Sequence, residues 1–489
     1  MKLHGGFLEM KNLPGVAGDR IFSREMKTFK DDLELDFSGK GIPFVSPGEK
    51  AGIFCQMENG PGEEAYRLII GNDGIKVIAS AGAGLWHGLQ TVRQLLLDNQ
   101  NVPLRIPLGE IEDYPRFPWR GFMLDCARHF YSPGFIKKLI RILCLQHINI
   151  FHWHLTDDQG WRLPVRDYPL LTEIGSRYRD HRLSGEFKGG FYTEEEIKEI
   201  VAYAEARHIE VYPEIDLPGH TSSVLAAYPG LGCTGGPYRV EDRYGIFEDV
   251  LCAGNDAVFD LAGKVFDSLA EYFPSEYVHI GGDEVMFNRW RDCHKCKKRL
   301  AETGLNKPRE LQSWITVKFA KMLKERGKTV IGWDEVLEDS EKYKLSKDVI
   351  VMSWRGRAGG LSASRLGHRV IMTPNTEGCY LDYRHTEEIE EPGNLGVSRV
   401  SQIYNMDPID PGMNAEEAGL VMGGQGNLWS EIIYSGKIAE YMIFPRICAL
   451  AESLWTPREQ KDLDDFARRL KAHRDRLDSL DVLQYRGYL

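Results

Sequence analysis

Short apolar runs of strand length alternate with longer segments of helical periodicity over most of the chain. We interpret eight of the short runs as β-strands, at residues 121–125, 148–154, 209–216, 277–281, 329–334, 349–354, 369–373 and 419–424. Apolar residues recur at helical spacing in segments 133–145, 193–207, 257–272, 309–326 and 359–366. Eight strands with helices mostly between them are the count of a (β/α)8 TIM barrel, in the α/β class. The pattern therefore predicts this barrel, followed by a helix-rich tail from residue 437 to about 477.

The N-terminal part of the chain has a different pattern. Two β-type runs, 66–70 and 75–78, flank the turn sequence at 71–74, and segment 85–97 has the spacing of an amphipathic helix. Pro115 and Pro118 then interrupt regular structure. We therefore predict two domains: a small α+β accessory domain at 1–112, and the barrel with its C-terminal helical tail at 113–489.

Composition and charge narrow the choice of partners. The 489 residues are 42% hydrophobic and 27% charged, as in a soluble globular protein. The formal net charge is −11 and Lys and Arg form no dense block, so we expect no nucleic-acid and no membrane partner. No apolar segment resembles a signal peptide or a membrane span, so we expect a cytoplasmic protein, or a secreted one if a signal has been trimmed. Nine scattered cysteines favour buried free thiols over a disulfide framework.

Polar and aromatic residues follow the apolar runs at the point where each run stops. In chain order they include Asp125, Arg128, His154, Asp157, Glu214, Asp216, His220, Asp283, Glu284, Trp333, Asp334, Glu335 and Trp354. In a barrel these positions converge on the C-terminal face, where the active site lies. Caps of the following helices could explain Asp125 or Asp334 individually, but not Arg, His and Trp at the same ends. The pattern indicates a polar pocket with aromatic walls.

The sharpest motif is the sequence VHIGGDE at 278–284, in which an apolar strand ends in two glycines and two adjacent carboxylates. A carboxyl pair on a rigid strand end suits acid–base chemistry on a glycosidic bond. Neighbours on one strand are nevertheless badly placed to flank that bond from opposite sides. They fit better if one is the acid and the other contacts a different atom of the substrate. The alternative is an ordinary loop.

The HIGGDE segment at 279–284 resembles the signature of glycoside hydrolase family 20, the β-N-acetylhexosaminidases. Further segments resemble motifs of that family in the same order: RGFMLDCARH at 120–129, FHWHLTDDQGW at 151–161, PEIDLPGHT at 213–221, GWDE at 332–335, SWRG at 353–356, YLD at 380–382 and LWSE at 428–431. Segments 66–68 and 88–91 resemble its accessory N-terminal domain. The resemblance covers nearly the whole chain and implies the TIM barrel.

The resemblance also implies a reaction. It is the removal of terminal non-reducing β-linked GlcNAc or GalNAc with retention, by substrate-assisted catalysis through an oxazolinium intermediate. Glu284 would be the general acid and then the base, and Asp283 would hydrogen-bond the acetamido N–H. Tyr380 would align the acetamido carbonyl, and Asp157 with His220 would form a relay that tunes Glu284. We expect burial to raise the pKa of Glu284. We expect Asp283, in contrast, to stay ionised.

Six further residues would bind the sugar on the same resemblance. They are Trp333, Trp354 and Trp429 around the acetamido methyl and the sugar face, and Arg128, Asp382 and Glu431 at the hydroxyls. Each also has a structural interpretation: a Trp at a strand end can be core, Arg128 an ion-pair partner and His220 a satisfied buried histidine. Asp158 competes with Asp157 for the relay, and the position of the family motif favours Asp157.

Two other classes of protein compete with this interpretation. His152 and His154 alternate on one strand and, with Asp283 and His220, could bind the zinc of a metal hydrolase, although His152 lies deep in its apolar run. A sugar-binding barrel without turnover would keep the Trp residues and lose the acid. The C-X-X-C segment at 293–296 lacks a second Cys or His pair at a suitable distance, so we expect neither a metal nor a cofactor.

The sequence leaves specificity and assembly open. It does not separate GlcNAc from GalNAc, and it does not name the natural aglycone or the oligomeric state. Long loops at 229–255 and 385–418 are expected near the barrel mouth. We expect them to shape leaving-group specificity or a homodimer contact.

Overall fold

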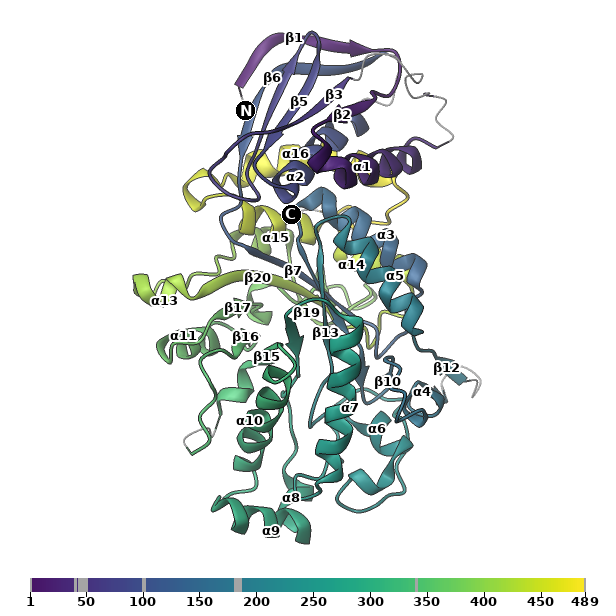
Figure 1. The fold of residues 1–489 in the computed structure, drawn as a ribbon, viewed down its shortest axis with the longest axis vertical. Coiled ribbons are helices and arrows are strands. Elements are labelled where there is room, and N and C mark those ends of the chain that lie inside the picture. Colours follow the sequence, from purple (N-terminus) through teal and green to yellow (C-terminus); the bar gives the residue numbers. More distant parts are fainter. Residues whose placement is uncertain are drawn as a thin grey trace.

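The structure is a computed structural model and describes residues 2–38, 42, 52–98, 103–179, 187–338 and 342–487. It consists of a barrel and an N-terminal sheet with two helices, which lies at one end of the molecule (Figure 1). Across the described ranges, every helix is too short or too polar to span a lipid bilayer.

Eight parallel strands close into a barrel in the order β13-β14-β15-β16-β17-β20-β7-β8. Their bounds are β7 Trp119–Asp125, β8 Ile150–His154, β13 Glu210–Glu214, β14 Tyr277–His279, β15 Thr329–Trp333, β16 Ile350–Ser353, β17 Val370–Met372 and β20 Val421–Leu428. Every predicted strand overlaps one of them, and the predicted TIM barrel is confirmed. The last strand continues four residues beyond the predicted end at 424, so Trp429 follows it directly.

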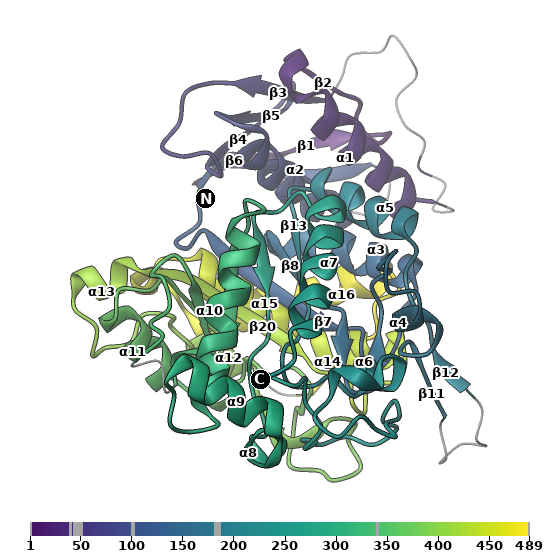
Figure 2. The same ribbon diagram turned by 60° about the horizontal axis from the view of Figure 1, so that its bottom comes forward.

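Helices surround the barrel in the predicted places. They are α3 Pro133–Leu143, α5 Glu194–Glu205, α7 Ala257–Tyr272, α10 Glu310–Lys324 and α11 Ala358–Arg365, with the tail α14 Gly436–Ile443, α15 Arg446–Trp455 and α16 Leu463–Ser479. Figure 2 shows α7 and α10 side by side on the barrel wall. The capping box of α5 pairs Thr193 with Glu196, as the TEEE sequence at 193–196 indicates.

Shorter elements lie in the connections. They are β9 Thr156–Asp157, β10 Gly160–Trp161, α4 Leu170–Glu173, β11 Arg177–Arg179, β12 Phe187–Gly189, α6 Ser222–Ala227, η3 Pro229–Leu231, α8 Asn288–Asp292, α9 His294–Thr303, η4 Asp334–Leu337, β18 Tyr383–Arg384, β19 Asn394–Val397, α12 Val400–Asn405 and α13 Ala415–Gly419. In Figures 1 and 2 alike, α8 and α9 lie at the end of the molecule opposite the N-terminal sheet.

The N-terminal sheet has six strands in the order β1-β6-β4-β5-β3-β2. Its elements are β1 Lys2–Met10, β2 Val16–Gly18, η1 Arg20–Phe22, α1 Ser23–Asp36, β3 Ile53–Met57, β4 Tyr66–Gly71, β5 Gly74–Ala79, α2 Gly82–Leu97 and β6 Leu104–Asp113. The sequence pattern predicts only β4, β5 and α2 among them. The sheet joins the barrel at the start of its strands: Arg120, in β7, forms an ion pair with Glu64, and the Asn149 amide before β8 donates to Glu64 at 3.4 Å. This contact lies at the end of the barrel opposite the carboxyl ends of its strands.

Candidate active site

The carboxyl ends of the barrel strands bring the predicted site residues to one face. Asp125, His154, Glu214 and Trp333 are the last residues of their strands, and Trp354 directly follows β16. Because all eight strands run in the same direction, these ends share one rim. The contacts described below link all eleven predicted site residues at this rim.

The backbone is strained where the chain leaves β13 and β14. Glu284 and His220 both have φ of 50°, in the left-handed region that non-glycine residues rarely adopt. Gly281 has φ of 66°, and a Cβ there would lie 1.8 Å from Asp216 Oδ1. The two glycines therefore let the chain turn against the Asp216 carboxyl and project the next two side chains into the mouth.

His220 connects the buried acids to the motif carboxylates. Its Nδ1 lies 3.2 Å from Asp158 Oδ2 and 3.3 Å from Asp157 Oδ1. Its Nε2 lies 3.6 Å from Glu284 Oε2 and 3.9 Å from Asp283 Oδ2. Burial lowers the pKa of His220, but Asp157 and the hydrogen-bonded carboxylates outweigh it and raise this pKa well above its usual value. The His220 imidazole thus lies between two pairs of acids, and both Asp157 and Asp158 contact it.

A buried network continues behind the relay. His154 Nδ1 lies 2.6 Å from Glu214 Oε2, and His154 Nε2 lies 3.1 Å from Asp157 Oδ2. His152 Nε2 and His279 Nδ1 each lie 2.9 Å from Glu214, and the Trp333 indole N–H donates to it at 2.9 Å. Burial raises the pKa of Glu214, yet the histidines lower it well below its usual range.

Glu214 was visible in the sequence only as a polar residue at a strand end, and no role was predicted for it. Its contacts with three imidazoles and one indole make it the residue that fixes the floor of the site. The alternation of His152 and His154 was the available signal, since both face one side of β8. Both contact Glu214, and among the described residues no metal-binding group unites them with His220 and Asp283. The zinc-hydrolase ligand set is therefore not assembled.

The two motif carboxylates differ in environment, but not as the sequence predicts. The Glu284 side chain is 34% exposed, so the expected burial in an aromatic pocket is wrong. The Asp283 side chain is 12% exposed, and burial together with Glu284 and Glu214 raises its pKa although His220 lowers it. The direction of this shift does not fix the charge, so the ionised state of Asp283 at neutral pH stays a prediction. A hydrogen bond with Asp216 lowers the pKa of Asp283 in part. The pKa of Asp216 is itself raised well above its usual value by burial and by Asp283.

Glu335 is a second carboxyl of the site for which no role was predicted. It accepts the Trp354 indole N–H at 2.9 Å. Burial, Asp283 and Asp334 raise its pKa to about 9. Its surroundings therefore favour the neutral form of the carboxyl at pH values near 7, although the Trp354 indole and Arg355 lower this pKa in part. The sequence indicated only that Glu335 follows a strand end.

Tyr380 and the three predicted tryptophans form one aromatic group. Trp354 and Tyr380 stack with ring centres 5.9 Å apart and an angle of 12° between planes. Trp429 lies 6.3 Å from Tyr380 and 5.8 Å from Trp333. Burial raises the pKa of Tyr380 well above its usual value, so the phenol is a hydrogen-bond donor at neutral pH.

The three predicted hydroxyl-binding residues lie beside this aromatic group. Arg128 lies over the Trp429 ring, 4.9 Å from its centre, and its Nη2 is 2.9 Å from Asp157 and 4.0 Å from Glu431. Asp382 accepts the Asn394 amide at 2.9 Å. Burial and Glu431 raise the pKa of Asp382 to about 7.

Several buried polar atoms at the mouth have no hydrogen-bond partner within the described parts of the chain. They are Arg128 Nε, His220 Nε2, Asp283 Oδ1, Asp382 Oδ1 and Glu431 Oε2. Buried polar atoms in proteins are nearly always hydrogen-bonded, so such a group points to a ligand rich in polar hydrogens and oxygens. Beside a wall of aromatic rings, a sugar has this character.

Comparisons with known proteins agree with this site. Residues 117–458 match glycosyl hydrolase family 20, catalytic domain, and residues 16–114 match glycosyl hydrolase family 20, domain 2. A beta-hexosaminidase of Porphyromonas gingivalis is 42% identical over 423 residues, which are 85% of this chain and 54% of that protein. One of Vibrio furnissii is 37% identical over 410 residues, which are 80% of this chain and 65% of that protein. The match thus spans between half and two thirds of these two relatives.

Solved structures are similar over the whole fold. A GH20 exo beta-N-acetylglucosaminidase from Vibrio harveyi, in complex with N-acetylglucosamine, aligns with a TM-score of 0.90 at 31% identity, covering 100% of this chain and 77% of that one. An N-acetyl-beta-hexosaminidase of Streptomyces plicatus, in complex with Thio-NAglucal, aligns with a TM-score of 0.86 at 31% identity, covering 99% and 95%. The family match over residues 117–458 and the relatives place the chain among the glycoside hydrolases. The chain is a member of glycosyl hydrolase family 20, which confirms the resemblance found in the sequence.

Proposed function

We propose that the protein is an exo-β-N-acetylhexosaminidase that removes terminal β-linked GlcNAc or GalNAc from oligosaccharides or glycoconjugates. The observation that carries the proposal is the set of unpartnered polar atoms beside the aromatic group, within reach of two adjacent carboxyls. Arg128, Asp382 and Glu431 offer one donor and two acceptors to ring hydroxyls. The names of the relatives and the structural neighbours support the same activity.

The spacing of the carboxyls supports retention of configuration. Oxygen atoms of Asp283 and Glu284 lie within 4.8 Å of one another and of a nitrogen of His220. An inverting enzyme needs carboxyl groups roughly 6.5–9.5 Å apart, with a water between one of them and the sugar. Neighbours on one loop also cannot attack from opposite faces. The nucleophile is then the substrate's own acetamido oxygen, as in the substrate-assisted families.

In this mechanism Glu284 protonates the glycosidic oxygen while the acetamido carbonyl attacks the anomeric carbon and the bond to the aglycone breaks. Asp283 accepts the acetamido N–H, and Tyr380 donates to the carbonyl and holds it near the reacting carbon. Glu284, now a carboxylate, takes a proton from the water that opens the oxazolinium ring. The exposure of Glu284 suits a group that must meet both an aglycone and a water molecule.

The direct test measures release of 4-nitrophenol from its β-GlcNAc, β-GalNAc and β-glucose glycosides, with and without EDTA. Release from the acetamido sugars alone, unaffected by EDTA, is expected because the proposed acid, base and nucleophile are organic groups. Release from the glucoside at a similar rate would exclude the acetamido nucleophile. Binding of GlcNAc without any turnover would favour a sugar-binding protein.

A second test addresses the nucleophile itself. Fluorine atoms on the acetamido methyl make its carbonyl oxygen a weaker nucleophile, so kcat should fall stepwise from acetamido to trifluoroacetamido substrates. A carboxylate nucleophile would leave kcat nearly unchanged along this series. An NMR spectrum of the first-formed sugar distinguishes retention, which gives the β-anomer, from inversion.

A further inference from the structure

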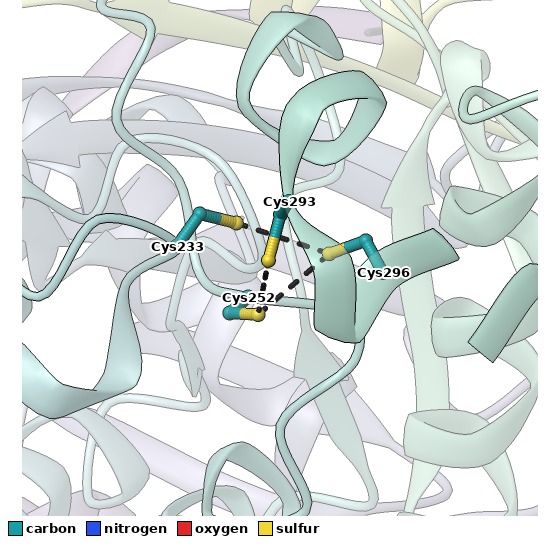
Figure 3. A group of neighbouring side chains, drawn as sticks. All are labelled: Cys233, Cys252, Cys293 and Cys296. Carbon is teal, nitrogen blue, oxygen red and sulfur yellow. Dashed lines mark hydrogen bonds between the residues drawn. The ribbon is translucent and has the colours of Figure 1, made fainter. Parts of the chain in front are cut away.

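Four cysteine side chains from three separate segments meet beside the barrel mouth. Cys233 follows η3, Cys252 lies in the same connection to α7, Cys293 is the N-cap of α9, and Cys296 lies in its first turn. Figure 3 shows the four side chains directed toward a common centre. Their sulfur atoms all lie within 4.8 Å of one another.

The sulfur–sulfur distances are those of a tetrahedron around a metal ion. Cys233 and Cys296 are 3.8 Å apart, Cys252 and Cys293 are 3.7 Å apart, and Cys252 and Cys296 are 3.6 Å apart. Four thiolates at the usual zinc–sulfur distance of about 2.3 Å occupy corners about 3.8 Å apart. A disulfide would require about 2.05 Å.

The surrounding backbone allows the segments that carry the four cysteines to approach one another closely. A Cβ on Gly254 would lie 2.1 Å from the carbonyl carbon of Lys295, so only glycine allows the two segments to approach so closely. The Trp290 indole N–H donates to the Leu251 carbonyl at 2.8 Å and joins α8 to the strand-like segment before Cys252. The N-terminus of α9, with Cys293 as its N-cap, also favours negative charge on these sulfur atoms.

We propose that these four cysteines bind one Zn²⁺ ion as a closed structural site. All four positions are protein thiolates, which leaves none for water or substrate, so the ion has a structural role. This proposal replaces the expectation of no metal. Spacing did not reveal it because the two partners of the C-X-X-C segment are single cysteines, 41 to 63 residues upstream of the residues they contact.

The proposed ion joins the two connections that carry the acid and its relay. Cys293 follows Glu284 by nine residues in the connection after β14, while Cys233 and Cys252 lie in the connection after β13 that also carries His220. The latter connection covers the relay, since the Glu241 N–H donates to the Asp158 carbonyl at 3.0 Å. The ion would hold both connections in one position.

Metal content is the decisive measurement. The full chain, purified without chelator, should contain one zinc per chain by elemental analysis and by native mass spectrometry. A mercurial reagent should release this zinc, and Co²⁺ in its place should give the visible bands of a tetrahedral thiolate complex. EDTA during a short assay should leave it in place, because a closed site offers no open position to the chelator.

Matched variants locate the ion. The double variant Cys293→Ser with Cys296→Ser should lose the zinc, and Cys55→Ser, at a buried thiol of the N-terminal sheet, should retain it. Hydrogen exchange should quicken at 229–255 and 285–303 in the zinc-free protein and stay unchanged in the N-terminal sheet. If the double variant does not fold, the zinc content and the cobalt spectrum of the parent chain still decide.

Three results would overturn the proposal. A metal-free chain lighter by the mass of four hydrogens would mean two disulfides. A metal-free chain with all four thiols open to alkylation would mean an unligated cluster. Stoichiometric iron with strong visible absorption would mean that a different thiophilic metal occupies the site. None of these outcomes depends on the glycosidase activity.

Discussion

One substitution, Asp382→Asn, should have opposite effects on stability and on catalysis: it should raise the free energy of unfolding and lower kcat/KM. The residue is 1% exposed, its side chain accepts the Asn394 amide at 2.9 Å, and its pKa is raised to about 7, first by burial and then by Glu431. An exposed Asp has a pKa of about 3.9. The folded protein therefore binds a proton at this site that the unfolded chain has already released between about pH 4 and pH 7.

The sign and size of the effect follow from this difference. Because the native state holds the extra proton, the ionised Asp382 lowers the free energy of unfolding progressively as the pH rises through this window. The loss is about 1.4 kcal/mol per pH unit and about 4 kcal/mol in total, and it is constant above the folded pKa. Asn has no such term. The difference in the free energy of unfolding, Asp382→Asn minus parent, should therefore increase by roughly 2–3 kcal/mol as the pH rises from about 5 to about 7.

Urea unfolding of both proteins at several pH values measures this difference. Other ionisable groups are common to both chains and cancel, and Asp475→Asn, at an exposed position of α16, provides the control with no change expected. Above about pH 7, where Asp382 is largely ionised, the same Asp382→Asn variant should lose about 10- to 100-fold in kcat/KM, since it removes a charged acceptor of a hydroxyl hydrogen bond. A stability difference that is flat or falls between about pH 5 and pH 7 would refute the reasoning.

Three further predictions concern the acids and the domain contact. Glu284→Gln should abolish hydrolysis of poorly activated aglycones and spare 4-nitrophenyl substrates in part, because only a poor leaving group needs the proton; equal losses on both would argue against an acid role. Asp283→Asn should lower kcat on every acetamido substrate, and near wild-type turnover would exclude its contact with the acetamido group. Asp36→Ala removes a carboxylate that accepts Arg93 Nε at 2.6 Å and Nη2 at 3.0 Å and also pairs with Arg141. The free energy of unfolding, measured with urea, should fall by about 3–5 kcal/mol, because two buried cations lose a partner. Asp31→Ala, on the exposed face of the same helix, should change it by less than about 1 kcal/mol.

The barrel could be predicted from the sequence because its parallel strands are covered on both faces. Such strands are continuous apolar runs, and each ends where the chain reaches the polar mouth. The N-terminal sheet was harder to predict. Most residues of β1 are exposed, so this strand lacks an apolar pattern, and α1 buries charged residues such as Asp32 and Asp36 that look like surface positions.

The site residues could be predicted as a set, while their environments could not. Each motif lies at a strand end, and the barrel brings strand ends together whatever the loops do. Exposure depends instead on the loops, which is why the predicted burial of Glu284 is wrong. The role of Glu214 could not be predicted for a related reason. It arises from His152, His154 and His279 on the two strands that flank β13, and the pattern of a single strand does not show contacts between strands.

The acid site and the cysteine cluster lie on the same two connections, after β13 and after β14. Glu284 and His220 hold left-handed backbone conformations, and such strain persists only where the surrounding structure enforces it. Glu284 is also 34% exposed, so close packing of its own side chain provides little of that constraint. The remaining constraint must come from the connections themselves. A metal that ties the connection after β13 to the connection after β14 supplies it at a distance from the substrate, and loss of the metal should therefore reduce kcat more than it weakens the binding of GlcNAc.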